Sequence, residues 1–394
     1  MKVTVILFCL LYFFSFSSIL FAQDSCHYRI SIITLSPGDE LYTVFGHSAI
    51  RVKDSVSNDD LIYNYGTFDF NEPNFLAKFI NGKLMYYVSN EDFLPFIQNY
   101  QAEKRTITEQ VLNLSCTEKM NIVNFLYHNL QGNNKFYKYD FISDNCTTRL
   151  RDLLDKNITG NTNFKRVVSS NKCYRDLLHS DLDYHDHQWI KLGIDILLGS
   201  RVDQKMNDKQ VMFLPDYLLA TIGNASVNNK PLVISKVNLS AEENSAGTHN
   251  IILGPLFIFT IFTVLIIYLT FAGNNHIKQI LFRSDSLLFF LLGLIGFILL
   301  YLWIVSDQLN YSNNYNIIWA LPLHIFFAFY ALKNNRFCKI YFKITAGIFI
   351  LLLLIWPTLP QHLNTSLVPI FVLMIFRSIV RGFNLENLYA RKNI

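Results

Sequence analysis

The chain has 394 residues, of which 51% are hydrophobic and only 16% are charged. This composition is too apolar for one ordinary soluble domain, and the length is sufficient for two units. Most acidic and basic residues fall within 23–248, whereas 251–380 holds repeated apolar runs close to the length that spans a bilayer. The net charge of +4 comes mostly from short basic segments between these runs, so it does not indicate nucleic-acid binding.

The N-terminus has the pattern of an export signal. Lys2 precedes an apolar run over residues 3–21, which ends at the small residue Ala22. We expect a signal peptide over residues 1–22, although the run is also long enough to remain as a signal anchor. Both alternatives export the segment that follows.

The exported part, placed at residues 23–230, is predicted to be an α+β domain with an antiparallel sheet. Alternating and β-branched segments predict strands, and apolar residues at helical spacing predict helices. We expect strands at 28–35, 44–52, 61–65, 84–89 and 105–114, and helices at 73–80, 92–101, 117–130, 189–198 and 215–221, with another helix starting at 144 or 145.

Several details of this domain are specific enough to be checked. Strands 44–52 and 61–65 are expected to form a hairpin across a polar turn. Thr117 is expected to cap its helix, with a core face of Met120, Val123, Leu126, Tyr127 and Leu130. Trp189 could dock on the membrane part, but apolar residues on both sides favour a core position. Residues 224–248 read as a polar linker, and we place the domain boundary at 231–250.

Two short motifs carry the chemistry. His47 lies on a predicted strand in the run Phe-Gly-His-Ser, and Cys146 opens a predicted helix in the run Asp-Asn-Cys-Thr-Thr. Unpaired N–H groups and the helix dipole at a helix N-terminus favour a thiolate. His47 can then serve as the base and later as the acid. Taken singly, each residue could be structural, but a core cysteine rarely has such polar neighbours.

The surrounding residues complete the predicted site. The Cys146 amide and a neighbouring amide can form an oxyanion hole, with Asn145 and Thr147 as oxyanion or positioning residues. Asn64 is the best candidate to orient the imidazole, because hairpin pairing brings its strand beside His47, with Tyr65 and Asp69 behind it. Two further residues of the same helix, Arg149 and Arg151, are candidates for binding a lipid phosphate.

Apart from the thiol chemistry, the exported part shows little sign of metal or disulfide chemistry. The sequence contains no CxxC or metal-finger spacing, and His185-Asp186-His187 is more simply a solvated loop than a metal site. We therefore expect no metal and no cofactor. If Cys146 is a free nucleophile, at most one disulfide can form among Cys26, Cys116 and Cys173.

Five later apolar runs predict membrane helices at about 251–272, 286–305, 317–332, 340–356 and 366–380. Lysines and arginines lie between the first and second runs, between the third and fourth, and after the fifth, whereas 306–316 and 357–365 contain neither. The positive-inside rule then places residues 23–248 outside and the tail at 381–394 in the cytoplasm. His324 in the third run is a functional candidate, although an interhelical hydrogen bond explains it equally well.

The motifs also carry a family resemblance. The order of a strand Phe-Gly-His and a helix-opening Asn-Cys resembles the circularly permuted NlpC-type, papain-like thiol enzymes. Residues 41–52, 63–70, 144–152 and 192–199 are more closely similar to the Lnb-type lipoprotein N-acyltransferases of Bacteroidetes-like bacteria. The resemblance covers nearly the whole chain, including the five C-terminal runs.

That resemblance implies a multi-pass protein of the bacterial inner membrane with a periplasmic N-terminal domain. It further implies that Cys146 takes an acyl chain from a membrane phospholipid as a thioester. The α-amine of a lipoprotein's lipidated N-terminal cysteine then receives the chain. Two alternatives from the residues themselves are a phospholipase or NlpC-type cell-wall peptidase on the same site, and an envelope scaffold without catalysis.

Overall fold

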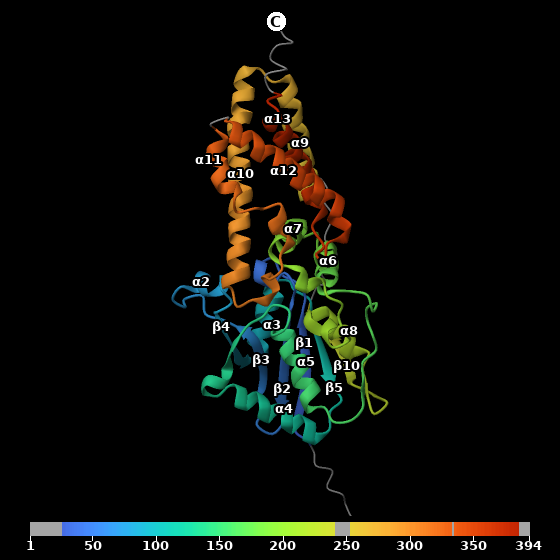
Figure 1. Ribbon diagram of the computed structural model, residues 1–394. Coiled ribbons are helices and arrows are strands. Elements are labelled where there is room, and N and C mark those ends of the chain that lie inside the picture. Colours follow the sequence, from blue (N-terminus) through green and yellow to red (C-terminus); the bar gives the residue numbers. More distant parts are fainter. Residues whose placement is uncertain (1–25, 241–252, 333–334, 386–394) are drawn as a thin grey trace, which may run out of the picture.

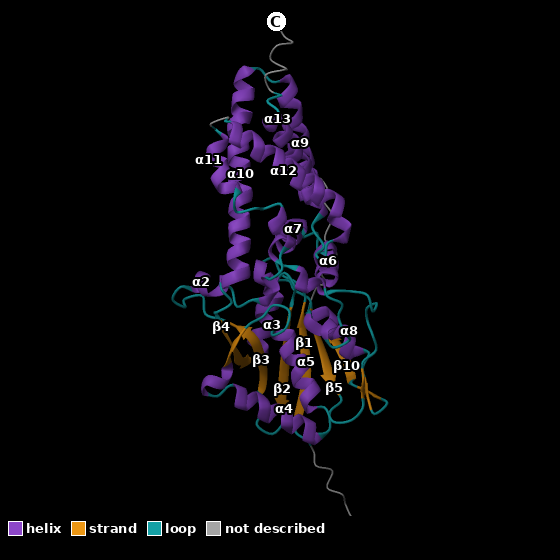
Figure 2. Ribbon diagram, in the orientation of Figure 1, coloured by secondary structure: helices purple, strands orange, loops and turns teal. Residues whose placement is uncertain are grey.

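The structure is a computed structural model that describes residues 26–240, 253–332 and 335–385. The expected signal peptide, part of the expected linker and most of the expected cytoplasmic tail lie outside the described residues. Figures 1 and 2 show two parts stacked along one axis, an α/β part built around a sheet and a helical bundle. This arrangement agrees with the division read from the hydropathy pattern.

The first part contains a seven-stranded antiparallel sheet in the order β10-β5-β1-β2-β3-β4-β6. The expected hairpin of β2 and β3 is confirmed by the pairing of Ile50 with Tyr63. The strands of this sheet are β1 (Tyr28–Leu35), β2 (His47–Asp54), β3 (Asp60–Thr67), β4 (Met85–Asp92), β5 (Ile107–Leu112), β6 (Phe136–Lys138) and β10 (Val233–Asn238). Three two-residue strands form a second sheet: β7 (Thr162–Asn163), β8 (Ser226–Val227) and β9 (Lys230–Pro231).

The expectation of a polar linker from residue 224 onward is wrong up to residue 238. β10 pairs with β5 along the sheet edge, with Lys236 opposite Gln110. The strand was missed because it is exposed along most of its length and only half of its six residues are apolar, so its alternation carries little hydrophobic signal. Backbone pairing with β5, rather than burial, fixes this segment to the domain.

Helices cover both faces of the large sheet. Leucines of α5 and α8 and the buried face of α4 pack on one face, and Phe96 and Ile97 of α3 pack on the other. The helices are α2 (Phe75–Ile80), α3 (Phe93–Ala102), α4 (Cys116–Asn129), α5 (Cys146–Asn157), α6 (Tyr174–Tyr184), α7 (Gln188–Leu197) and α8 (Pro215–Gly223). Leu150, Leu153 and Leu154 of α5 are buried in this core.

The start and the core face of α4 differ from the prediction. Ser115, not Thr117, caps the helix, in a reciprocal arrangement with the backbone and carboxylate of Glu118. The helix buries Ile122 and Leu126, while the expected core residue Tyr127 is 64% exposed. The buried carboxylate of Glu118 also accepts hydrogen bonds from Thr159. The buried face of α4 therefore includes Glu118 together with Ile122 and Leu126.

The second part is a helical bundle with four helices that are long and apolar enough to cross a membrane, within the described residues. The bundle consists of α9 (Pro255–Ala272), α10 (Asn275–Val305), α11 (His324–Ala331), α12 (Arg336–Ile355) and α13 (Val368–Gly382). The second helix starts earlier than expected, so Lys278 and Arg283 lie within it. Arg381 is buried and ion-paired with Asp285 of α10, so it is not the loop charge that the sequence indicated.

The third expected helix is the exception, because α11 has only eight residues. The preceding segment is a 3₁₀ turn, η7 (Tyr315–Ile318), followed by a break at Pro322. This segment packs directly on the backbone of α10, where a Cβ atom added to Gly296 would lie 1.6 Å from the carbonyl oxygen of Ala320. The absence of a side chain at Gly296 of α10 therefore allows the non-helical segment before α11 to pack where a continuous membrane helix was expected.

A buried polar cluster joins the two parts. The carboxylate of Asp195 in α7 accepts hydrogen bonds from Arg175 at 2.7 Å, His179 at 2.8 Å and Asn364 of the bundle at 2.8 Å. Asn316 of the bundle donates to the Asp195 carbonyl oxygen at 2.8 Å. Asp195 is only 1% exposed, so the loss of one of these hydrogen bonds would leave a buried polar group without a partner and would lower the stability of the folded protein.

The core position favoured for Trp189 is wrong. Its side chain is 47% exposed, and its indole N–H donates to the carbonyl oxygen of Leu253 at 2.8 Å. Its ring also meets Phe259 of α9 edge to face. Trp189 therefore docks on the helical bundle, the alternative to the core position that the sequence favours.

Candidate active site

Local backbone geometry brings His47 and Cys146 together. His47 begins β2 directly after Gly46, whose φ of +74° and close approach to the Leu35 carbonyl oxygen exclude a side chain. Cys146 is the first residue of α5, which packs against β2 and β3. Gly66 of β3 also has positive φ and lies beside Cys146, where an added Cβ would be 3.6 Å from the cysteine Cβ.

The imidazole of His47 lies between the thiol and an amide. Its Nε2 is hydrogen-bonded to Oδ1 of Asn64, and the thiol of Cys146 contacts the ring as a second hydrogen-bond partner. Because Asn64 occupies Nε2, Nδ1 is the nitrogen left to exchange a proton with sulfur. The structure thus assembles three residues that the sequence reasoning selected, from β2, β3 and α5.

The charges at this contact favour a thiolate and an imidazolium. Burial alone would raise the pKa of Cys146, but the His47 charge and hydrogen bonds from His47, the Ser48 backbone and Thr147 lower it to about 7. Burial alone would lower the pKa of His47, but the charge and hydrogen bond of Cys146, with the bond to Asn64, raise it above its usual value. Each group therefore stabilises the charged form of the other.

The helix cap explains what Asn145 and Thr147 do. The Asn145 side-chain oxygen accepts from the amides of Thr147 and Thr148, each at 2.9 Å, and its Nδ2 donates to the carbonyl oxygens of Phe141 and Phe213. These bonds position the first turn of α5. They also occupy the Thr147 amide, so this amide would have to leave the Asn145 oxygen to serve as an oxyanion donor, and the Cys146 amide remains the first candidate for that role.

Ser48 is a site residue that the sequence reasoning missed. Its backbone N–H donates to the sulfur of Cys146, and its hydroxyl accepts from the Thr147 hydroxyl at 3.2 Å. Its position next to His47 was the available signal. By contrast, Asp69 accepts a hydrogen bond from the Asn71 amide in a local turn.

Arg149 and Arg151 are already paired with carboxylates. Arg149 donates to both oxygens of Asp144, and its guanidinium lies 3.7 Å from the Tyr137 ring centroid. Arg151 donates to both oxygens of Asp152. A phosphate would therefore have to compete with existing ion pairs at either arginine.

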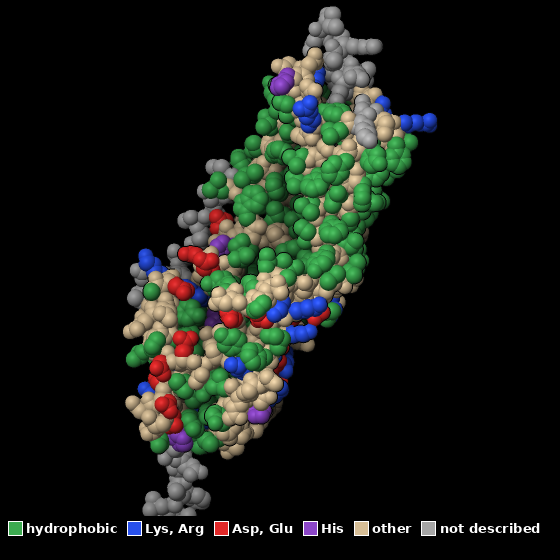
Figure 3. All heavy atoms as spheres, turned by 90° about the vertical axis from the view of Figure 1, so that its left-hand side faces the viewer, with side chains coloured by type: hydrophobic (Ala, Val, Ile, Leu, Met, Phe, Trp, Pro, Cys, Tyr) green, Lys and Arg blue, Asp and Glu red, His purple; other side chains and the backbone are tan. Residues whose placement is uncertain are grey.

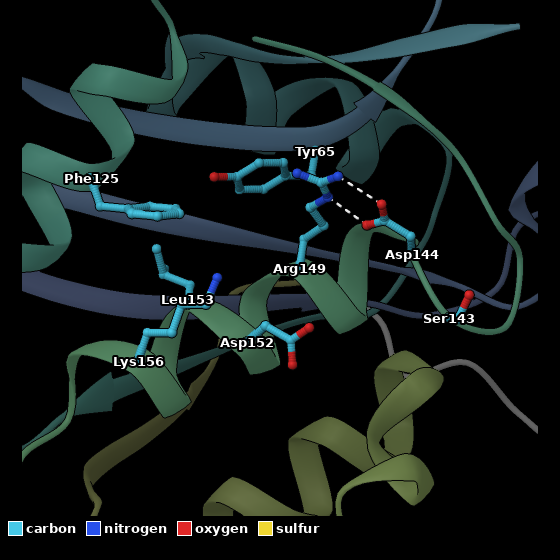
Figure 4. A pocket seen from close by; sticks show the side chains of 8 residues that line it. All are labelled: Tyr65, Phe125, Ser143, Asp144, Arg149, Asp152, Leu153 and Lys156. Atoms are coloured by element: carbon cyan, nitrogen blue, oxygen red, sulfur yellow. Dashed lines mark hydrogen bonds and ion pairs between the residues drawn. The ribbon is translucent and has the colours of Figure 1, made fainter. Parts of the chain in front are cut away.

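A pocket of about 350 Å³ opens on the flank of α5 (Figure 4). Figure 4 shows the Arg149–Asp144 pair beside the ring of Tyr65, with Phe125 across from it. The lining residues are Tyr65, Phe125, Ser143, Asp144, Arg149, Asp152, Leu153 and Lys156. Because neither His47 nor Cys146 lines this pocket, we do not assign the chemistry to it.

The loop between α10 and α11 reaches the segment that precedes Cys146. Gln308 donates to the Tyr139 carbonyl oxygen at 2.7 Å, and Asn310 donates to the Asp140 carboxylate at 2.9 Å. The end of the sheet-containing part that holds the candidate site therefore faces the helical bundle.

Other candidate groups have different environments. Cys26, Cys116, Cys146, Cys173 and Cys338 carry free thiols. Cys173, Asp203 and His362 lie close enough to hold a metal ion, but Asp203 already pairs with Arg175, and burial raises the pKa of Cys173 to about 11. In the bundle, His324 is fully buried and hydrogen-bonded to Tyr341 and to the Trp319 carbonyl oxygen, which agrees with the interhelical alternative.

Together these observations define a class of protein: a helical membrane anchor that carries a domain with a Cys-His-Asn site at the anchor-facing end. Comparison with known families makes this specific. The profile of the Lnb N-terminal periplasmic domain matches residues 22–180, and that of the Lnb transmembrane domain matches residues 247–387. The chain belongs to the Lnb-type family, and it is a multi-pass membrane protein with a periplasmic N-terminal domain. No curated protein and no solved structure matches it.

Proposed function

We propose that this protein is a lipoprotein N-acyltransferase of the inner membrane. The donor is a membrane phospholipid, and the acceptor is the α-amine of the lipidated N-terminal cysteine of a lipoprotein. The observation that carries the proposal is the contact of Cys146, His47 and Asn64, with a Cys146 pKa of about 7, at the end of the periplasmic domain nearest the bundle.

In the first half-reaction, the Cys146 thiolate attacks an ester carbonyl of the phospholipid. The carbon–sulfur bond forms and the ester carbon–oxygen bond breaks. The departing oxygen takes a proton from His47, so the products are a thioester on Cys146 and a lysophospholipid. Asn64 holds the ring through Nε2 while Nδ1 transfers the proton.

In the second half-reaction, the lipoprotein amine attacks the thioester carbon. His47 accepts the proton that the amine loses, the new amide forms, and the Cys146 thiolate departs. Dividing one acyl transfer into two steps lets each substrate use the same nucleophile and base. The amphiphilic donor and acceptor are both held at the bilayer surface, which raises their effective concentration at the site.

The topology supports this assignment. The start of α10, the helix that carries Lys278 and Arg283, lies at the end of the bundle away from the sheet. In Figure 3, blue side chains gather near the end of the bundle farthest from the α/β part. By the positive-inside rule that end is cytoplasmic, so the C-terminus is expected in the cytoplasm and Cys146 in the periplasm.

The decisive experiment is acyl transfer with the full-length protein in phospholipid nanodiscs. A synthetic lipopeptide with an S-lipidated N-terminal cysteine is the acceptor, and mass spectrometry detects an amide-linked chain on its amine. We expect Cys146→Ala to abolish the product. Cys173→Ser is the matched control, because it removes another buried thiol and replaces it with a hydroxyl at the N-cap of α6.

Three results would contradict the proposal. Unchanged N-acylation by Cys146→Ala would exclude the thioester route. Release of free fatty acid without an acylated peptide, even with acceptor present, would indicate a phospholipase. Absence of any acyl adduct on Cys146, combined with unaffected growth of cells carrying Cys146→Ala, would favour a scaffold.

A further inference from the structure

Two segments of the periplasmic domain next to the site expose large apolar side chains. The first is η1 (Leu41–Thr43), which precedes His47, and the second is the stretch from β3 to the end of α2. We call these exposed side chains the aromatic lip: Leu41, Tyr42, Phe70, Leu76 and Phe79. Each is more than half exposed, from 51% at Phe79 to 71% at Leu41. A patch of this kind beside a candidate active site indicates a binding surface.

Ring contacts connect the lip across its two segments. Tyr42 of η1 meets Phe70 at 6.2 Å, and Phe70 meets Phe75 at 5.4 Å. Phe75 stacks on Phe79, one turn further along α2, at 6.2 Å. Tyr42, Phe70 and Phe79 are therefore connected through ring contacts that include Phe75, and Leu41 and Leu76 are neighbours of these residues along the chain.

One end of the lip is fixed to the outer end of α10. The backbone N–H of Asp307 donates to the Asn81 carbonyl oxygen at 2.9 Å, and the hydroxyl of Ser306 donates to the Ile80 carbonyl oxygen at 3.1 Å. The Tyr301 hydroxyl donates to the Asn81 side chain at 2.9 Å. These three bonds hold α2 at the level where α10 ends, as Figure 1 shows.

The surface of α10 next to this junction is itself apolar and exposed. It presents Tyr301, Trp303, Ile304 and Val305 near its outer end, a composition typical of the bilayer interface. In Figure 3, whose viewer faces the side that carries α2, hydrophobic side chains cover the bundle and continue in patches onto the domain. The lip therefore continues the lipid-facing surface of α10 out of the bundle.

The other end of the lip leads to Cys146. Phe68 contacts the lip residue Phe70 at 4.7 Å and stands two residues after Gly66, which touches Cys146. Phe68 also contacts Tyr86 at 5.1 Å, and Tyr86 stacks on Tyr139 at 4.4 Å. Aromatic rings thus lead from α2, which is bonded to the outer end of α10, to Tyr139, seven residues before Cys146 in the chain.

We propose that the aromatic lip inserts into the outer leaflet and binds an acyl chain of a phospholipid beside Cys146. This proposal rests on the proposed function, since a chain bound at the lip would place its ester at the Cys146 thiolate. Lipid contact at the lip can be measured without any reaction, so the two proposals can fail separately.

The test uses full-length Cys146→Ala in nanodiscs that contain a phospholipid with a diazirine in its acyl chain. After irradiation, mass spectrometry maps the labelled peptides. We expect labels on residues 68–80 as well as on α10. Leu76→Ser/Phe79→Ser should lower labelling of the lip about tenfold and leave labelling of α10 unchanged. Tyr127→Ser removes an equally exposed aromatic from α4 and should change neither.

A second measurement links the lip to the reaction. With Cys146 intact, Leu76→Ser/Phe79→Ser should slow acylation of the thiol by nanodisc phospholipid about tenfold. Acylation by a water-soluble short-chain thioester should be unchanged. An equal loss with both donors would show a damaged site and overturn the proposal. So would labelling of residues 68–80 no higher than that of α4. Labelling of the lip without any acylation of Cys146 would uphold the lip and refute the acyltransferase.

Discussion

Asn310, from the loop between two bundle helices, donates a hydrogen bond of 2.9 Å to the carboxylate of Asp140, six residues before Cys146. The other carboxylate oxygen of Asp140 accepts from the amides of Ile142 and Ser143 and from the Ser143 hydroxyl. Asp140 therefore shapes the loop that leads into the cap of α5, and the anchor holds Asp140. The bundle thus contributes to the geometry of the site as well as to membrane attachment.

We predict that Asn310→Ala slows acylation of Cys146 about fivefold, the effect of losing roughly one hydrogen bond. The inflection in the pH dependence of Cys146 alkylation should stay in place, because the His47 contact is unaltered. Initial rates in nanodiscs give the measurement. Asn313→Gly, which removes an exposed side chain from the same loop and tolerates its positive φ, is the control. Equal rates for Asn310→Ala and the native protein would show that the contact is dispensable.

We predict that Cys146 alkylates as a thiolate near neutral pH. Its rate with iodoacetamide should rise with pH and reach half its maximum at about 7, since its pKa lies there. Cys173, whose pKa is raised to about 11 by burial, should remain nearly unreactive in the folded protein. In His47→Ala the inflection of Cys146 should move upward, because burial then acts without the opposing charge. Peptide mapping after timed labelling distinguishes the two cysteines, and an unmoved inflection would refute the pairing.

We predict that Asn64→Ala lowers the rate of acyl transfer by as much as about a hundredfold, because it releases the ring of a general acid and base. Asn64→Asp keeps an acceptor oxygen at Nε2 and should recover part of the rate. The rate should be measured across pH, since loss of the acceptor should also lower the pKa of His47. If neither substitution changes the rate of acyl transfer, Asn64 does not position the ring of His47.

We predict that Asp181→Asn stabilises the domain at pH 8 and not at pH 4. Burial and the nearby Asp216 charge raise the pKa of Asp181 from 3.8 to about 7. Between those values the folded protein binds more protons at this position than the unfolded chain, so stability falls as pH rises toward 7. The amide introduced at this position does not ionise, so this loss of stability with rising pH should disappear. Thermal unfolding in detergent at both pH values gives the comparison, and an equal shift at both would contradict the ionisation argument.

Sequence patterns determined those features that depend on neighbours along the chain. The period-two alternation of residues 28–35 and the polar turn before residue 61 predicted the strands and the hairpin of β2 and β3 correctly. The polar residues before Cys146 predicted a helix start, and Asn145 is its cap. Long apolar runs with basic ends predicted the membrane helices, because bilayer thickness sets their length.

Tertiary structure decided where long-range contacts overrule local signals. β10 has little apolar pattern of its own, and it is held in the sheet by backbone pairing with the open edge of β5. Trp189 is as apolar as a core residue, yet the bundle supplies its partner. The run at 317–332 is apolar enough for a helix, but close packing on Gly296 and a proline break it.

The site divides along the same line. Local sequence patterns were enough to propose Cys146 as the nucleophile, His47 as the base and a shortlist for the third residue, because helix-end chemistry and hairpin pairing are local. Only the tertiary structure decided that Ser48 donates to sulfur, that the Asn145 cap occupies the Thr147 amide, and that Asn310 of the anchor reaches the site. Each of these depends on a hydrogen bond whose geometry is set by how β2, α5 and the bundle pack, and residue identities alone do not encode that distance.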